Sequence, residues 1–142
     1  MKLNELEKII NDSFENKDKI NTNSEKTIIN AINETIELTD QGKIRVAEKK
    51  NGSWEINQWI KKAILLSFRI NKMEILRGPY TSWYDKVPGK SVNWKKEDWD
   101  KAGYRHVPNG VVRKGSFIAK NAVLMPCFVN LGAYVDLSLI HI

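Results

Sequence analysis

The chain has 142 residues, 42% of them hydrophobic, with 23 Lys and Arg against 17 Asp and Glu and a formal net charge of +6. This length suits one ordinary domain or two small pieces, each with a modest core. The lysines are scattered among asparagines and isoleucines, which indicates a solvated surface and argues against a nucleic-acid partner. The single cysteine, Cys127, excludes an internal disulfide framework, fits a reducing compartment and is expected to be inert.

No segment has the character of a targeting sequence or a membrane span. The N-terminal stretch MKLNELEKII is too polar for a signal peptide. The longest apolar run, AILL, is far shorter than the roughly 20 residues that cross a bilayer. A cytoplasmic location without membrane contact is therefore expected.

The first half of the chain predicts helices and a hairpin. Two amphipathic helices are expected, the first over 3–14 and the second between Ser24 as N-cap and Gly42 as stop signal. Asn51-Gly52 lies between two alternating segments, which is a strong signal for a β-hairpin. The stretch QWIKKAILLSFRIN favours a third helix by its length.

Residues 78–108 are rich in aromatic side chains and turn residues. A short helix is expected near KKEDWDKAG, and the aromatic residues are expected to pack an irregular core. Pro108-Asn109-Gly110 predicts a turn, which we take as a domain boundary.

A period of six residues begins at Val111. Bulky residues occupy the first position of each block of six and small residues the fifth; these are Val111, Phe117, Val123, Val129 and Val135, and Gly115, Asn121, Cys127 and Ala133. Six is a multiple of the strand period, and it spreads residues around a helix, so the repeat predicts strands stacked into a solenoid. The pattern fails after Asp136, where Leu139 takes a small position.

Several familiar catalytic sites are missing from the sequence. It has no phosphate-binding glycine loop, no paired cysteines and no histidine spacing that suits a metal. The two histidines, His106 and His141, give little basis for a Ser-His nucleophile or a metal centre. We therefore expect no bound metal and no bound cofactor.

Five segments together carry a resemblance to a known family. They are Ile44-Arg45-Val46-Ala47-Glu48-Lys49, QWIKKAILLSFRIN, YDKVP at 84–88, GYRHVP at 103–108 and FIAKNAVLMPCFVNLGAYVD. In this order and spacing, from about Leu3 to Asp136, the chain resembles the N-terminal half of the tetrahydrodipicolinate N-succinyltransferases. The resemblance implies an α+β N-terminal domain, with helices and a hairpin, followed by the first coils of a left-handed parallel β-helix built on hexapeptide repeats.

The resemblance also implies a reaction and its partners. A cytoplasmic homotrimer would transfer succinyl from the cosubstrate succinyl-CoA to the amino group of ring-opened tetrahydrodipicolinate, in the diaminopimelate route of lysine biosynthesis. Arg105 matches the family arginine that contacts the dicarboxylate substrate. The family's catalytic Asp would fall one block after Asp136, and there this chain has Ile142. No catalytic residue is therefore assigned in this chain.

Three further residues are weighed for the site. Asp136 is expected to have a structural or interface role more than to line the site, and Asn130 to hydrogen-bond along the stack. His106 stands where the family pattern has an aliphatic residue, and an approach to substrate is the less favoured reading for it.

The expected organisation is a domain over 1–108, the start of the β-helix over 109–136 and a non-native tail over 137–142. The tail LSLIHI resembles one reading frame of a transposon-end adapter used for sequencing libraries. Because about one and a half coils are few for a solenoid, the chain is expected to be a truncated, inactive fragment that forms no stable trimer. Two alternatives stay open: a non-enzymatic assembly or regulatory module, and another CoA-dependent hexapeptide acyltransferase.

Overall fold

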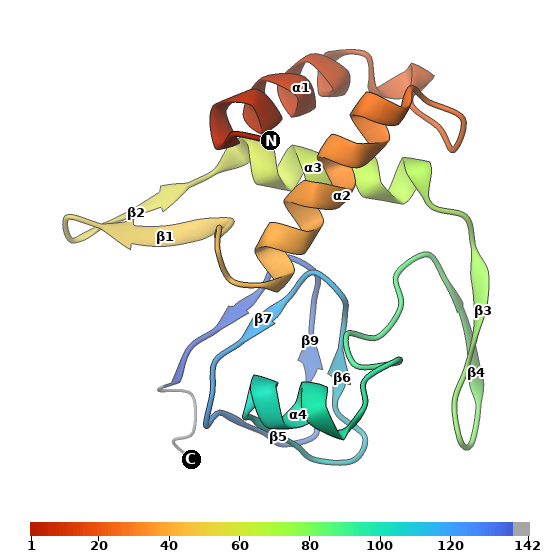
Figure 1. The fold of residues 1–142 in the computed structure, drawn as a ribbon, viewed down its shortest axis with the longest axis vertical. Helices are drawn as coiled ribbons and strands as arrows, with labels where there is room; N and C mark the ends of the chain where they lie inside the picture. The colour runs from red at the N-terminus through yellow and green to blue at the C-terminus, as the bar shows by residue number, and fades with distance from the viewer. Residues whose placement is uncertain (138–142) are drawn as a thin grey trace.

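The computed structural model describes residues 1–137, in which a layer of three helices covers a set of short parallel strands (Figure 1). The helices are α1 (Leu3–Glu15), α2 (Lys26–Asp40) and α3 (Gln58–Ile70), with a short 3-10 turn, η1 (Lys17–Lys19), after α1. Their apolar faces meet in one core, formed by Leu6, Ile10, Ile20, Ala31, Ile32, Ala63, Leu66 and Ile70. The α+β character and the three predicted helices are confirmed.

The two ends of α2 test the predicted helix signals. Gly42 adopts a φ of +70°, and the following Lys43 N–H donates to the carbonyl of Leu38 at 2.9 Å, a glycine stop as predicted. The N-cap prediction was wrong. The helix starts after Glu25, and the Ser24 hydroxyl oxygen accepts the N–H of Asn21 instead, because the loop before the helix folds into its own tight turn.

Two antiparallel hairpins project from the body. The predicted one is confirmed: β1 (Ala47–Lys50) pairs with β2 (Ser53–Ile56), with Asn51 and Gly52 both at positive φ in the turn. The second, β3 (Glu74–Arg77) with β4 (Ser82–Asp85), falls partly in the stretch expected to be loop. Its turn lies at 78–81, where Gly78 N–H donates to the Thr81 carbonyl.

The C-terminal part consists of six two-residue strands in three parallel pairs. They are β5 (Arg105–His106) with β8 (Val123–Leu124), β6 (Val111–Val112) with β9 (Phe128–Val129), and β7 (Phe117–Ile118) with β10 (Tyr134–Val135). The first four strands begin six residues apart, and then β9 begins five residues after β8. Each strand therefore pairs with the third strand after it, once the chain has turned three times.

The predicted phase of the repeat was displaced by one residue in its first blocks. Val112, Ile118 and Leu124 face the core, whereas Val111 is 46% exposed. The shorter turn between β8 and β9 then brings Val129 inward. Counting every sixth residue does not allow for this shorter turn. The count therefore placed Val111, which faces outward, and Val129, which faces inward, in the same column.

A cluster of aromatic side chains, the aromatic layer, lies beside α4 (Lys96–Ala102). The short helix near KKEDWDKAG is confirmed. Trp94, Trp99 and Tyr104 meet edge to face, with ring centroids 4.9–6.0 Å apart, and Tyr104 packs with the inward column. The expectation of an aromatic core holds for these three residues, whereas Tyr80, Trp83 and Tyr84 are exposed on the second hairpin.

The Tyr104 hydroxyl is the one buried side-chain polar atom in residues 1–137 without a hydrogen-bond partner. Burial raises the pKa of Tyr104 to about 12, and the negative charge of Asp40 acts in the same direction. Because the phenolate is disfavoured in the folded state, the folded protein holds this proton at a pH where an exposed tyrosine has released it.

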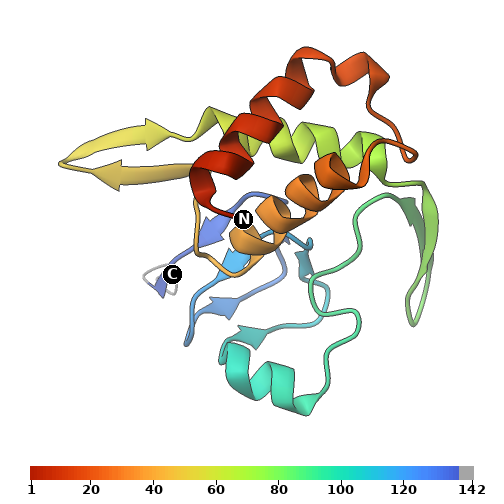
Figure 2. The ribbon, with the colours of Figure 1, turned by 45° about the horizontal axis from the view of Figure 1, so that its top comes forward.

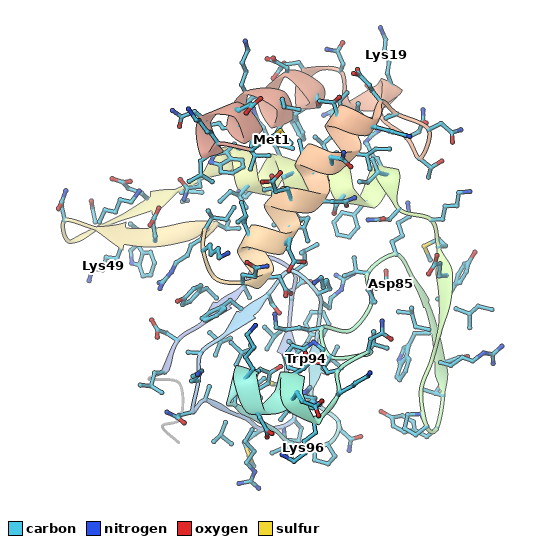
Figure 3. All side chains as sticks on the ribbon, in the orientation of Figure 1. Met1, Lys19, Lys49, Asp85, Trp94 and Lys96 are labelled. Atoms are coloured by element: carbon cyan, nitrogen blue, oxygen red, sulfur yellow. The ribbon has the colours of Figure 1, made fainter. Side chains whose placement is uncertain are left out.

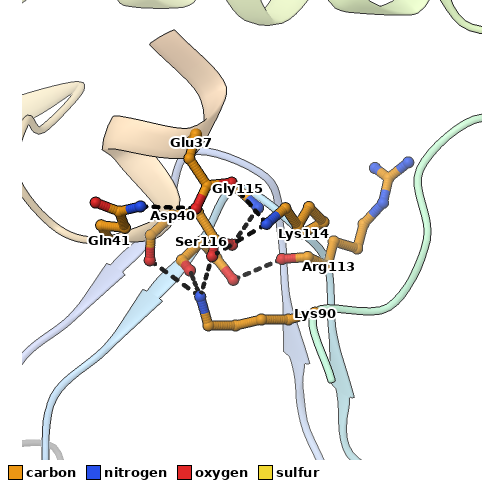
Figure 4. Close-up of polar contacts among 8 residues, drawn as sticks. All are labelled: Glu37, Asp40, Gln41, Lys90, Arg113, Lys114, Gly115 and Ser116. Atoms are coloured by element: carbon orange, nitrogen blue, oxygen red, sulfur yellow. Dashed lines mark hydrogen bonds and ion pairs between the residues drawn. The ribbon is translucent and has the colours of Figure 1, made fainter. Parts of the chain in front are cut away.

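A buried ion pair joins the helical layer to the strands (Figure 4). The ammonium of Lys90 donates to the Asp40 carboxylate at 2.8 Å, to the Asp40 carbonyl at 3.0 Å and to the Ser116 carbonyl at 2.8 Å. The other Asp40 oxygen accepts the Gly115 N–H at 2.6 Å. All three donors of the lysine are thus used, and a cation neutralises a carboxylate at the C-terminal end of α2, where a negative charge is unfavourable.

At the edge of this cluster, Lys114 lies 2.8 Å from Glu37 and 3.6 Å from Asp40. The Lys114 hydrogen bond, followed by one from Gln41, lowers the pKa of Glu37. Burial lowers the pKa of Lys90 despite its Asp40 partner. The Lys90–Asp40 pair is therefore more desolvated than the Lys114–Glu37 pair.

Replacement of Lys90 by Met is expected to lower the free energy of unfolding by about 3–5 kcal/mol, because it leaves the buried Asp40 carboxylate without its main counter-charge. Urea denaturation followed by circular dichroism measures this change. Lys114→Met, which removes a more exposed cation from the same carboxylate, is the matched control and is expected to cost less than about 1 kcal/mol. Equal losses for the two variants would contradict the assignment.

Tyr104→Phe is expected to leave stability at neutral pH unchanged or to raise it by up to about 1 kcal/mol, because an unpartnered hydroxyl is removed. The pKa of Tyr104 is raised from 10.0 to about 12, so below pH 10 the hydroxyl is neutral in both the folded and the unfolded state. Between pH 10 and about 12 the unfolded state releases this proton more readily, so the free energy of unfolding falls as the pH rises. Urea denaturation at pH 9 and pH 11.5 should therefore show a smaller alkaline loss in Tyr104→Phe than in the unmodified chain. Identical losses would show that this hydroxyl titrates normally.

Candidate functional site

Arg105, the residue expected to bind substrate, lies in β5, the first of the parallel strands. Its backbone N–H donates to the Ala122 carbonyl at 2.9 Å, which fixes the strand against β8. Its side chain is exposed, and within residues 1–137 it makes no hydrogen bond or ion pair. A guanidinium held on a fixed strand with all of its donors unused suits a carboxylate, which it binds with two parallel hydrogen bonds.

The residues on either side explain why Arg105 faces outward. Side chains alternate along a strand, and both neighbours, Tyr104 and His106, point to the aromatic layer. The His106 ring lies 6.1 Å from that of Trp99 and 6.4 Å from that of Tyr104. His106 thus occupies an inward position as a packing residue, and this placement gives no support to an approach to substrate.

Asn130 forms a hydrogen bond along the stack, as predicted. Its Oδ1 accepts from Arg113 Nη1 at 2.9 Å, and Arg113 follows the strand that pairs with the one before Asn130. The other guanidinium nitrogen of Arg113 lies 2.9 Å from Asp85 at the base of the second hairpin. Arg113 therefore ties two successive coils to the hairpin, and both of its ends are occupied.

Asp136 directly follows β10, near Arg45 at the base of the first hairpin. Its carboxylate is exposed, accepts the Leu137 N–H at 2.8 Å and is 3.9 Å from the guanidinium of Arg45. The Arg45 guanidinium also lies 3.4 Å from the centre of the Tyr134 ring. Ile142, the position expected to correspond to the family Asp, is outside the described residues, as are 138–141 of the predicted tail.

A pocket of about 250 Å³ lies between the helical layer and the strands. Its lining residues are Asn33, Ile36, Glu37, Ser67, Asn71, Lys86, Val87, Pro88, Lys114 and Leu131. Arg105 is not among them. The pocket is therefore separate from the predicted substrate arginine, and it shares Lys114 and Glu37 with the ionic cluster.

Neither the ionic cluster nor the contacts made by Arg113 has a signal in the local sequence. Asp40 and Lys90 are 50 positions apart and carry no local signal, since neither is part of a motif.

Within residues 1–137 no group of three or more His, Cys, Asp or Glu side chains is arranged to hold a metal ion. In the same range none of the helices combines the length and apolar character that crossing a bilayer requires. Cys127 is exposed with a free thiol.

Comparison with known proteins supports the family suggested by the sequence. Residues 5–70 match the family model described as "Tetrahydrodipicolinate N-succinyltransferase N-terminal". The curated relatives carry the name 2,3,4,5-tetrahydropyridine-2,6-dicarboxylate N-succinyltransferase.

The relative from Pelagibacter ubique is 64% identical over 137 residues, which is 94% of this chain and 50% of that protein. The one from Agrobacterium fabrum is 52% identical over 90% of this chain and 46% of its own length. The one from Parvibaculum lavamentivorans is 49% identical over 96% of this chain and 50% of its own length. The chain thus spans about half the length of the curated relatives that it matches. Residues 5–70 thus match the N-terminal model of the tetrahydrodipicolinate N-succinyltransferases, and nearly the whole chain is similar to proteins of that name.

Proposed function

We propose that this sequence encodes the N-terminal half of an enzyme that transfers succinyl from succinyl-CoA to the amino group of ring-opened tetrahydrodipicolinate. The observation that carries the proposal is the 64% identity to a named succinyltransferase over 94% of the chain. The reaction belongs to the diaminopimelate route of lysine biosynthesis, in the cytoplasm. The chain by itself is proposed to be inactive.

We propose that the parallel strands are the opening coils of a left-handed β-helix. The three parallel pairs and the six-residue spacing of β5 to β8 support this fold. The proposed division is a domain over 1–108 and a β-helix that starts at 109. The first parallel strand, β5, already lies at Arg105–His106, so the two parts share this segment.

The proposed chemistry is direct attack of an amine on a thioester. The substrate nitrogen forms a bond to the succinyl carbonyl carbon, the carbon–sulfur bond breaks, and the nitrogen's proton is lost as the CoA thiol leaves. The rate depends on an unprotonated amine held against the thioester and on a stabilised oxyanion. Arg105 would hold a carboxylate of the substrate and so orient the amine.

The remaining roles follow the same proposal. Asp136, which lies near Arg45, is proposed to be structural, and Asn130 to support the stack. No residue of this chain is proposed as the catalytic carboxylate, because the corresponding position is Ile142. Succinyl-CoA would be a cosubstrate and not a resident cofactor. The complete protein is proposed to be a homotrimer without nucleic-acid or membrane partners.

Two alternatives are separated by sequence and assay. A continued reading frame past residue 136, with further six-residue blocks and an Asp at the next second position, supports the enzyme; a true stop supports an assembly or regulatory module. Comparing succinyl with acetyl transfer by the complete enzyme tests a different acyltransferase on the same fold.

A chimera tests the proposal on this chain's own residues. Residues 1–136 of this chain, joined to the remaining half of the Pelagibacter ubique relative, are expected to release CoA from succinyl-CoA when tetrahydrodipicolinate is present. The 142-residue chain alone is expected to release none. A folded chimera without activity would contradict the proposed function.

In the same chimera, Arg105→Gln is expected to lower kcat/KM for tetrahydrodipicolinate by about a hundredfold, since hydrogen bonds to a charged group are lost. Arg105→Lys keeps the charge but loses the two parallel hydrogen bonds, so its kcat/KM is expected to lie between those of the unmodified chimera and Arg105→Gln. Arg77→Gln, at an exposed arginine on β3, is the control and should leave kcat/KM unchanged. An unchanged kcat/KM in Arg105→Gln would remove this residue from the site.

A further inference from the structure

The two hairpins extend from opposite sides of the body (Figures 1 and 2). Both carry exposed apolar side chains. On β1–β2, Trp54 is 70% exposed and Ile56 is 55% exposed. On β3–β4, Trp83 is 46% exposed. A two-stranded hairpin is marginally stable in water by itself, so an uncovered apolar face on such an arm calls for a partner.

The first hairpin has one satisfied face and one uncovered face. Lys50 lies on the first, 2.8 Å from Glu48 and 3.4 Å from Glu55. The second face contains the cross-strand pairs Ala47–Ile56 and Lys49–Trp54. Figure 3 places Lys49 on the arm, away from the body, and in residues 1–137 its ammonium has no hydrogen-bond or ion-pair partner. We call these four residues the basic apolar face.

One face of the second hairpin is complementary in charge. It contains the cross-strand pairs Leu76–Trp83 and Glu74–Asp85. Asp85 is already paired with Arg113, whereas Glu74 has no ion-pair partner in residues 1–137. We call these four residues the acidic apolar face. The opposite face of the same hairpin, with Ile75 and Tyr84, carries Arg77 in place of an acid.

We propose that the basic apolar face of one copy docks on the acidic apolar face of a second copy. Trp54 would lie against Leu76 and Trp83, and Lys49 would meet Glu74. The reverse face is disfavoured, because it would bring Arg77 toward Lys49. This inference does not depend on the proposed function.

A second copy suits both faces better than an unrelated partner. Each chain carries both complementary surfaces, they are different from each other, and they lie on opposite sides, which is the arrangement of a head-to-tail contact that a rotation can close into a ring. Each face involves four residues of a narrow arm, far below the 20–30 residues of a standard interface side. The contact is therefore weak by itself and adds to any larger interface between copies.

The test is sedimentation velocity of the purified chain over a wide concentration range, with circular dichroism to confirm the fold of every variant. The unmodified chain is expected to associate reversibly. Trp54→Ser is expected to weaken association by at least about tenfold, since a central aromatic anchor is lost. Tyr84→Ser, which removes an exposed aromatic residue from the opposite face of β3–β4, is the matched control and should have no effect.

Charge exchange identifies the pairing itself. Lys49→Glu and Glu74→Lys are each expected to weaken association by about threefold, and the double variant is expected to restore it. Lys43→Glu makes the same charge change outside the face and should have no effect. A chain that stays monomeric at every concentration, association that is indifferent to Trp54→Ser, or a double variant that fails to recover would each overturn the proposal.

Discussion

The ammonium of Lys90 is the contact on which the arrangement of this protein depends. It replaces water with three protein oxygens, two from the last residue of α2 and one from the turn between β6 and β7. A buried ammonium is costly unless each donor is satisfied, so the three acceptors have to be in place together. The orientation of the first coil beneath α2 is consequently fixed by one side chain, with the Gly115 N–H on Asp40 as a second restraint.

The position of the exposed arginine follows from that arrangement. Once the coil is fixed, the inward column and the aromatic layer take Tyr104 and His106, and alternation leaves Arg105 on the outside of β5. The Arg105 side chain needs no contacts of its own to keep this orientation, because pairing with β8 fixes the strand. Arg113 differs from Arg105, because its guanidinium already binds Asn130 and Asp85. Two arginines eight positions apart thus have opposite roles, and sequence composition alone does not distinguish them.

Local signals predicted the elements that are made by neighbouring residues. The helix faces, the Gly42 stop and the Asn51-Gly52 turn depend on spacing or on backbone freedom within a few residues, and all are present. The Asp40–Lys90 pair spans 50 positions and gave no local signal. Gly78-Pro79 marks the turn between β3 and β4, but such a dipeptide does not by itself predict that the flanking segments pair as strands. Arg105 was identified by the resemblance to a family and not by a local pattern.

The error in the phase of the repeat has a physical cause that bears on how short strands hold together. A two-residue strand has little pairing of its own, so its place is set by the corner that precedes it. The corners place residues at positive φ, namely Asn109, Gly115, Asn121 and Gly132. Glycine and asparagine tolerate this conformation best. The sequence pattern placed Gly115 and Asn121 in a column of small packing residues. Their residue types are instead required by the positive φ of the backbone at these corners. The packing is done one position later, by Ser116 and Ala122. A coil of this kind is specified first by its corners, which is why one missing corner residue shifts the inward column without breaking the stack.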